Sequence, residues 1–160
     1  MTLASGSSGS KIDLDTRGGS TSITPAVRVS LLLVIVVALV VYLPYQSISL
    51  DDFDSFNFAR ALTGFNPSVG IPHAPGYVLY IALGRLMLWL TGDPHTALTL
   101  LSALSASFAC GVLFLLGTLL FDRYVGLAAS TLVLLMPVMW LNAEKALSDS
   151  PGLLLQSATI

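Results

Sequence analysis

The chain has 160 residues, enough for one ordinary domain, but its composition is not that of a soluble protein. Hydrophobic residues make up 54% of it and charged residues 10%, and the mean hydropathy is +0.83, which indicates that lipid is its solvent. The charges are scattered and sum to -2, so no nucleic-acid partner is expected. The single cysteine, Cys110, excludes a disulfide within one chain and is expected to be a small buried hydrophobe.

The N-terminal segment divides into a polar tail and a first membrane span. Residues 1–27 are rich in Gly, Ser and Thr, which predicts a disordered tail. Residues 28–45 are almost wholly apolar and long enough to cross a bilayer. Lys and Arg precede this span and Asp follows it, so the tail is predicted to be cytoplasmic. The alternative of a cleaved signal peptide is disfavoured because the preceding tail is long and no small-x-small cleavage site follows Leu43.

Two further spans are predicted at residues 96–121 and 125–141. The first carries no charge and many small residues, which favour close packing of membrane helices. The second contains Pro137, where a kink is expected. Only three residues separate these spans, so they are predicted to form a tight antiparallel hairpin. A fourth apolar run starts at residue 151 and stops at Ile160, which is interpreted as a truncated span.

The segment 76–90 leaves the topology open. It is apolar but only 15 residues long, and it contains Arg85, which costs about 2.5–3.5 kcal/mol near the centre of a membrane helix. If this segment crosses, the acidic residues at 144–149 lie on the opposite side of the membrane from those at 51–54. If it lies along the interface, they share one side. The sequence favours the interfacial helix, within a first outer loop spanning residues 46–95 of an all-α, polytopic membrane protein.

Polar residues that could carry chemistry occur in two places. Asp51, Asp52 and Asp54 follow the first span, and carboxylates crowded at one surface make a general base available. The alternative is a solvated loop with one Asp at a helix N-cap. A second cluster comprises Glu144, Lys145 and Asp149, which could also be the ordinary charged fringe of a membrane helix.

Between these clusters lies His73, in the run Ile-Pro-His-Ala-Pro-Gly-Tyr, where two prolines and a glycine constrain the backbone. A histidine held near an acidic cluster could bind a metal or shuttle protons, or it could be an ordinary exposed loop residue. Soluble-enzyme motifs such as a phosphate-binding loop or a His-Glu-x-x-His sequence do not occur.

Three patterns in family-like order and spacing carry a resemblance to known enzymes: Asp-Ser-x-Asn-Phe-Ala from Asp54, His-x-Pro-Gly-Tyr from His73, and Ser-Asp-x-Pro from Ser148. With them, residues 29–160 resemble the N-terminal part of membrane glycosyltransferases of the GT-C fold. This group contains the protein O-mannosyltransferases and aminoarabinose transferases and is similar to glycosyltransferase family 39. Ala74 departs from the pattern, because many relatives carry proline there.

The resemblance implies a GT-C-type bundle with juxtamembrane helices in the first outer loop, in the plasma (inner) membrane. It implies a polyprenyl-phosphate sugar donor and transfer outside the cytoplasm, and leaves the acceptor open. Asp54 would be the base, with Asp51 and Asp52 as alternatives, and Glu144 or Asp149 the second carboxylate. A divalent metal could be held by Asp54, His73 and Asp149. Substrate-binding roles would fall to Asn57, Arg60, His73, Tyr77, Arg85 and Lys145.

A different class remains open: a non-catalytic membrane protein, either a transporter fragment or an assembly subunit. A transporter is expected to hold ionisable residues near mid-membrane, but the spans at 96–121 and 125–141 contain none. Relatives have many more crossings, so the 160-residue chain is expected to be inactive alone.

Overall fold

The computed structural model describes residues 24–160, and most of the predicted tail lies outside them. Of that tail, residues 25–27 already belong to the first helix. The described part is helical and contains no strand, only an isolated bridge between Asn66 and Ile71, which confirms the all-α prediction. The α-helices are α1 (Pro25–Tyr42), α2 (Phe53–Thr63), α3 (Val78–Thr91), α4 (Pro94–Leu120), α5 (Arg123–Leu135), α6 (Pro137–Glu144) and α7 (Asp149–Ser157), with short 3-10 turns η1 (Leu43–Tyr45) and η2 (Pro67–Val69).

Two of the described helices are long and apolar enough to cross a membrane, namely Pro25–Tyr45, which combines α1 with η1, and α4. The first begins where Thr24 caps Val27 and Pro25 supplies a preformed helical φ. Much of its apolar surface is exposed, including Leu32 and Val40. Water would solvate that surface poorly, so it fits a lipid-facing helix.

Helix α4 forms the centre of the molecule and contacts α1, α2, α3, α5, α6 and α7. It starts at Asp93, whose carboxylate accepts hydrogen bonds from the N–H and the hydroxyl of Thr96, at 2.8 and 2.7 Å. Its buried residues are mostly small, including Ala97, Ser102 and Ala106. Small side chains let neighbouring backbones approach closely, so several helices can pack around α4.

Helices α4 and α5 form the predicted tight antiparallel hairpin. Asp122 caps α5 by accepting from the N–H groups of Tyr124 and Val125. Near the turn Gly117 faces Gly126, and a Cβ built on Gly117 would lie 2.7 Å from the Gly126 Cα. The two backbones therefore touch at a point where only glycine fits.

The third predicted span, residues 125–141, is broken. Helix α5 ends at Leu135, α6 starts at Pro137, and their axes differ by 62°. Pro137 has no N–H to donate and its ring clashes with the preceding turn. The kink expected at this proline is therefore a full break, and α5 with α6 counts as a third candidate span only if the bent pair is taken as one.

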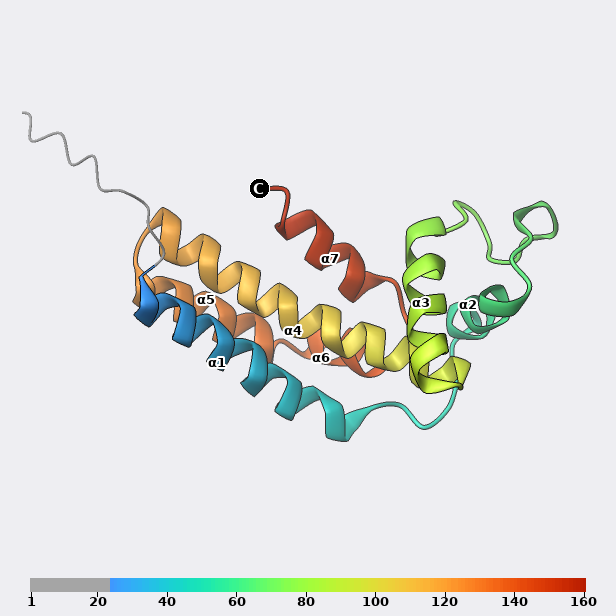
Figure 1. Ribbon diagram of the computed structural model, residues 1–160, viewed down its shortest axis with the longest axis horizontal. Coiled ribbons are helices and arrows are strands. Elements are labelled where there is room, and N and C mark those ends of the chain that lie inside the picture. Colours follow the sequence, from blue (N-terminus) through green and yellow to red (C-terminus); the bar gives the residue numbers. More distant parts are fainter. Residues whose placement is uncertain (1–23) are drawn as a thin grey trace, which may run out of the picture.

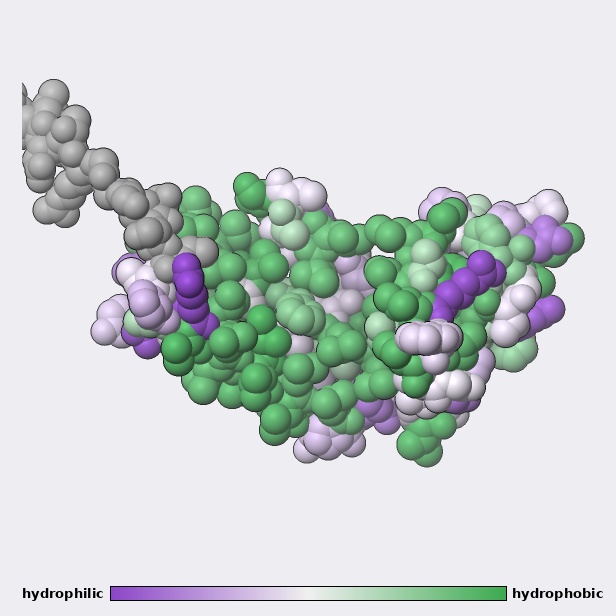
Figure 2. All heavy atoms as spheres, viewed as in Figure 1, coloured by the Kyte–Doolittle hydropathy of each residue, from purple (hydrophilic) through white to green (hydrophobic). Residues whose placement is uncertain are grey.

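The helices give the molecule two distinct ends. In Figure 1, α1, α4 and α5 run side by side along the long axis, while α3 runs across that direction and α2 lies beyond it. The start of α1 and the α4–α5 turn lie at the opposite end. Figure 2 shows hydrophobic residues over the middle of the same face and hydrophilic residues at both ends. These features are those of a membrane protein.

Candidate functional site

The two acidic segments meet at the end of the molecule that carries α2 and α3. The Ser47 N–H donates to the Glu144 carbonyl at 3.0 Å, and the Gln46 amide donates to the Ala143 carbonyl at 3.1 Å. Lys145 Nζ lies 3.0 Å from Asp52 Oδ2. The hydrogen bond from Lys145 to Asp52 and the charge of that carboxylate raise the pKa of Lys145. The segment after α1 and the end of α6 are therefore joined.

The three carboxylates of the first cluster have different surroundings. Asp51 accepts a hydrogen bond from the Ser49 hydroxyl. Asp52 occupies the N-cap position of α2, but its side chain makes no capping hydrogen bond and pairs with Lys145 instead. Asp54 lies in the first turn of α2 with its side chain half exposed, and its Oδ1 is 3.7 Å from His73 Nε2.

His73 is held by aromatic side chains. Its ring centroid lies 5.7 Å from that of Phe58 and 5.2 Å from that of Tyr77, and Phe58 itself contacts Tyr77 at 4.9 Å. The Nδ1 atom is buried and has no hydrogen-bond partner among the described residues. The imidazole is thus fixed beside Asp54 and is not a freely solvated loop side chain.

The remaining residues predicted to bind substrate lie on α2 and α3. Arg85 donates from Nε to the Leu62 carbonyl at 2.9 Å and from Nη2 to the Ala61 carbonyl at 3.4 Å. Its guanidinium therefore binds the C-terminal end of α2. Arg60 is exposed and lies over the Phe56 ring at 5.7 Å. The side chain of Asn57 is buried within α2.

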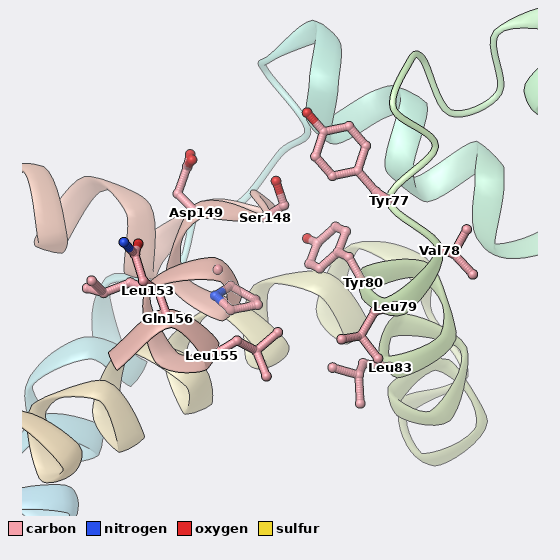
Figure 3. A pocket seen from close by; sticks show the side chains of 12 residues that line it. Tyr77, Val78, Leu79, Tyr80, Leu83, Ser148, Asp149, Leu153, Leu155 and Gln156 are labelled. Carbon is pink, nitrogen blue, oxygen red and sulfur yellow. The ribbon is translucent and has the colours of Figure 1, made fainter. Parts of the chain in front are cut away.

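A cavity of about 560 Å³ lies between α3 and α7. Figure 3 shows Tyr77 and Tyr80 on the α3 side facing Ser148 and Asp149 on the α7 side, with leucine side chains gathered lower in the view. Tyr77 belongs both to this wall and to the aromatic contacts of His73. Tyr77 is therefore the residue that the cavity shares with the contacts of His73, whereas neither Asp54 nor His73 lines the cavity.

Tyr80 is not among the site residues predicted from the sequence, and its place in the cavity wall was missed. Its side chain is 5% exposed, and its hydroxyl has no partner among the described residues. Burial raises the pKa of the phenol, and the charge of Asp149 raises it further. The available signal was its spacing, because Tyr80 follows Tyr77 by three positions and so shares its helix face.

The predicted metal ligands are only partly brought together. Asp54 and His73 are neighbours. Within residues 24–160, however, no three His, Cys, Asp or Glu side chains are placed to hold a metal ion together. A divalent metal therefore stays a prediction, and no chemical step is derived through it.

Comparison with known proteins gives one match. The model of the family described as protein O-mannosyl-transferase TMEM260 N-terminal domain matches residues 65–147. Neither the curated proteins nor the solved structures contain a match. The matched segment is just over half of the chain and includes the His73 loop, α3, α4 and Lys145, while Asp54 and Asp149 lie outside it. The chain therefore belongs to the family of the protein O-mannosyl-transferase TMEM260 N-terminal domain.

Proposed function

We propose that the chain takes part in transfer of a sugar from a polyprenyl-phosphate donor to an acceptor hydroxyl outside the cytoplasm. Membership of the family implies O-mannosyltransferase-like glycosyl transfer at the level of the family. Support for a site in this chain comes from the contacts between residues 46–52 and residues 143–145, including the ion pair of Asp52 with Lys145. Both acidic clusters are then available to one reaction.

The direction of α3 supports placing that site at the membrane surface. With α1 and α4 spanning the bilayer, α3 would run along the interface, because it crosses their direction (Figure 1). Its exposed side chains include Leu86, Trp89 and Leu90, and an interfacial helix presents such an apolar face to lipid. This arrangement supports the interfacial alternative for residues 76–90, in which Arg85 would lie above the hydrocarbon.

Asp54 is the best candidate for the general base. Asp52 is neutralised by Lys145 and Asp51 accepts from Ser49, whereas within residues 24–160 the Asp54 carboxylate has the imidazole of His73 as its only such partner. This difference is the observation that carries the assignment, because a base needs a lone pair that is free for the acceptor proton. The His73 contact would orient the Asp54 carboxylate.

In the proposed reaction the acceptor hydroxyl gives its proton to Asp54 as its oxygen bonds to the anomeric carbon. The bond between that carbon and the donor phosphate oxygen breaks, and the electron pair leaves with the phosphate. The products are the glycosylated acceptor and polyprenyl phosphate, and Asp54 then releases its proton to water. Lys145 is the proposed partner of the phosphate, because an ammonium has three donors and Asp52 needs one.

Of the two candidates for a second carboxylate, Asp149 is favoured. Asp149 lines the cavity between α3 and α7, whereas Glu144 contributes its backbone carbonyl to the contact with Ser47. Asp149 would therefore be the carboxylate that reaches a bound substrate.

The test replaces the natural gene with variants and measures mannose transfer from labelled polyprenyl-phosphate mannose in isolated membranes. Native membranes retain any partner polypeptide that the reaction needs. We expect Asp54→Asn to lower transfer by at least about 10²-fold, the usual contribution of a general base. Asp51→Asn is the matched control and should retain most of the activity at equal protein level.

Equal activity of Asp54→Asn and the natural chain would remove Asp54 from the mechanism. If transfer persists unchanged in membranes that lack this chain altogether, the non-catalytic alternative, an assembly subunit or transporter fragment, becomes the better hypothesis.

A further inference from the structure

The cavity between α3 and α7 has two chemically different walls. Tyr77, Tyr80, Ser148 and Asp149 line one part of it and Leu83 and Leu155 line another, with Gln156 as a further polar lining residue. Such a site fits an amphiphile whose polar group is joined to a hydrocarbon. With its volume of about 560 Å³, the cavity falls within the range of roughly 300–1,000 Å³ typical of small-molecule sites.

The Tyr80 hydroxyl supplies a hydrogen-bond donor that the protein itself does not use. The nearby Ser102 hydroxyl, whose proximity lowers the pKa of the phenol, donates to the Leu147 carbonyl at 3.0 Å, and the Tyr80 hydroxyl has no partner with hydrogen-bond geometry among the described residues. Buried polar groups are nearly always paired, so an unpaired one that borders a cavity indicates a ligand atom. That atom must be a hydrogen-bond acceptor, because the phenol retains its proton.

The charge of the cavity wall determines which chemical group of a ligand can bind there. Among its twelve lining residues there is no Lys, Arg or His, and Asp149 contributes a carboxylate. A phosphate placed there would meet a like charge and no cation, which is unfavourable in a site of low dielectric. A neutral hydroxyl is favoured, because it can donate to Asp149 and accept from Tyr80 at the same time.

We propose that this cavity is the sugar subsite: it binds the uncharged hexose of an amphiphilic donor through Tyr80 and Asp149, with its leucine wall against the adjoining hydrocarbon. The identification of that hexose with the transferred mannose rests on the proposed function. The phosphate would then lie outside the cavity, with Lys145 as its proposed partner.

Binding to the purified 160-residue chain in lipid nanodiscs tests the subsite without requiring turnover. The probe is octyl α-D-mannopyranoside, titrated by calorimetry with empty nanodiscs subtracted. We expect Tyr80→Phe to weaken binding about five- to tenfold, the loss of one hydrogen bond. Tyr124→Phe is the matched control and should bind as the natural chain does, because Tyr124 is exposed at the α4–α5 turn.

A second variant fills the cavity. Gly152 lines it, and a Cβ built there meets no atom within 4 Å. Gly152→Leu should therefore abolish measurable binding without lowering the thermal midpoint, since it removes a helical glycine and creates no clash. Unchanged binding in both Tyr80→Phe and Gly152→Leu would overturn the subsite.

A competition experiment separates the sugar from the phosphate. Octyl phosphate should bind more weakly than the mannoside and should not displace it, whereas tighter binding with displacement would overturn the sugar assignment. Failure of the proposed function has a different signature: normal transfer by Asp54→Asn membranes, with mannoside binding still sensitive to Tyr80→Phe. If mannoside binding is instead insensitive to Tyr80→Phe while transfer depends on Asp54, the proposed subsite is wrong and the proposed function stands.

Discussion

The guanidinium of Arg85 binds carbonyls that the last turn of α2 leaves free. Its donors reach the carbonyls of Ala61 and Leu62, and its Cζ atom lies 5.9 Å from the centroid of the Phe65 ring. These contacts join α3 to the end of α2, and therefore fix the helix that carries Tyr77 relative to the helix that carries Asp54. A role for Arg85 in structure is thus more direct than the role in substrate binding predicted for it.

Arg85→Gln should lower the free energy of unfolding by about 1–2 kcal/mol, because charge-assisted hydrogen bonds to the α2 carbonyls are lost. The measurement is chemical unfolding of the purified chain in detergent. Arg60→Gln removes the same charge from a side chain that makes no hydrogen bond to the described residues, and it should change stability by less than about 0.5 kcal/mol. Equal losses in both variants would contradict the structural role of Arg85.

The stability of the folded chain is expected to depend on pH through the carboxyl group of Asp93. Hydrogen bonds from the backbone N–H and the hydroxyl of Thr96 hold the pKa of Asp93 below its usual value of 3.8. A carboxyl whose pKa is lower in the folded than in the unfolded state stabilises the fold at pH values above its unfolded pKa. This contribution is lost as the pH falls through the folded pKa. The cap therefore contributes fully at neutral pH.

Asp93→Ala should lower the thermal midpoint at pH 7, because the start of α4 loses its cap. The difference between variant and natural chain should shrink as the pH falls below about 3.8, where the natural carboxyl becomes protonated. Thermal unfolding as a function of pH measures this. A difference that stays constant down to pH 2 would show that the carboxylate charge has no part in capping.

At the scale of elements, the α4–α5 hairpin depends on the contact between Gly117 and Gly126. A Cβ on Gly117 would meet backbone, which cannot rotate aside as a side chain can. The fold of this hairpin therefore depends on residues that have no side chain at all, and the short Asp122 turn depends on the close approach that they permit.

Gly117→Ala should destabilise the chain by about 1–3 kcal/mol through overpacking. Gly152→Ala is the matched comparison, because its Cβ enters open space, and it should raise stability by up to about 1 kcal/mol as a helical glycine is replaced. Unfolding of both variants in the same detergent checks the contrast. Destabilisation by both to the same extent would argue against a specific contact at Gly117.

The elements were predictable where the signal is local. Long apolar runs predicted spans at residues 28–45 and 96–121, where the structure has the helices Pro25–Tyr45 and Pro94–Leu120. The short length of residues 76–90 together with Arg85 predicted that α3 differs from them. The size of the bend at Pro137 was not predictable, since a proline fixes the loss of a hydrogen bond but the angle depends on the helices packed around it.

The site was predictable in its residue types and not in its pairings. Crowded carboxylates and a constrained His73 pointed to one region, and the structure places Asp54 beside His73. The pair between Asp52 and Lys145 joins residues far apart in the chain, and no periodicity reports such a contact. The cavity was missed for the same reason, because its walls come from two helices separated by α4, α5 and α6.

For the whole molecule, the structure predicts which surfaces share a side of the membrane. The segment before α2 and the η2 loop lie at one end, and the α4–α5 turn lies at the other (Figure 1). Ile48, Val69 and Tyr124 are exposed at 97%, 65% and 82%, so cysteines at these positions would be accessible to reagents.

In a Cys110→Ala background, Ile48→Cys and Val69→Cys should react with an impermeant thiol reagent applied to intact cells, and Tyr124→Cys should not. After permeabilisation Tyr124→Cys should react as well, which controls for accessibility. The reverse pattern would place the acidic clusters in the cytoplasm and contradict transfer outside it.

The central position of α4 determines where the chain tolerates substitution. Its buried small residues, such as Ala103 and Ala109, are fully enclosed, and the helices around α4 carry both the lipid-facing surface and the cavity wall. An added methyl group there moves several helices apart at once, whereas an added methyl group on the exposed face of α1 meets only lipid. A saturation mutagenesis scan should therefore find its most intolerant positions along α4, including positions far from any carboxylate.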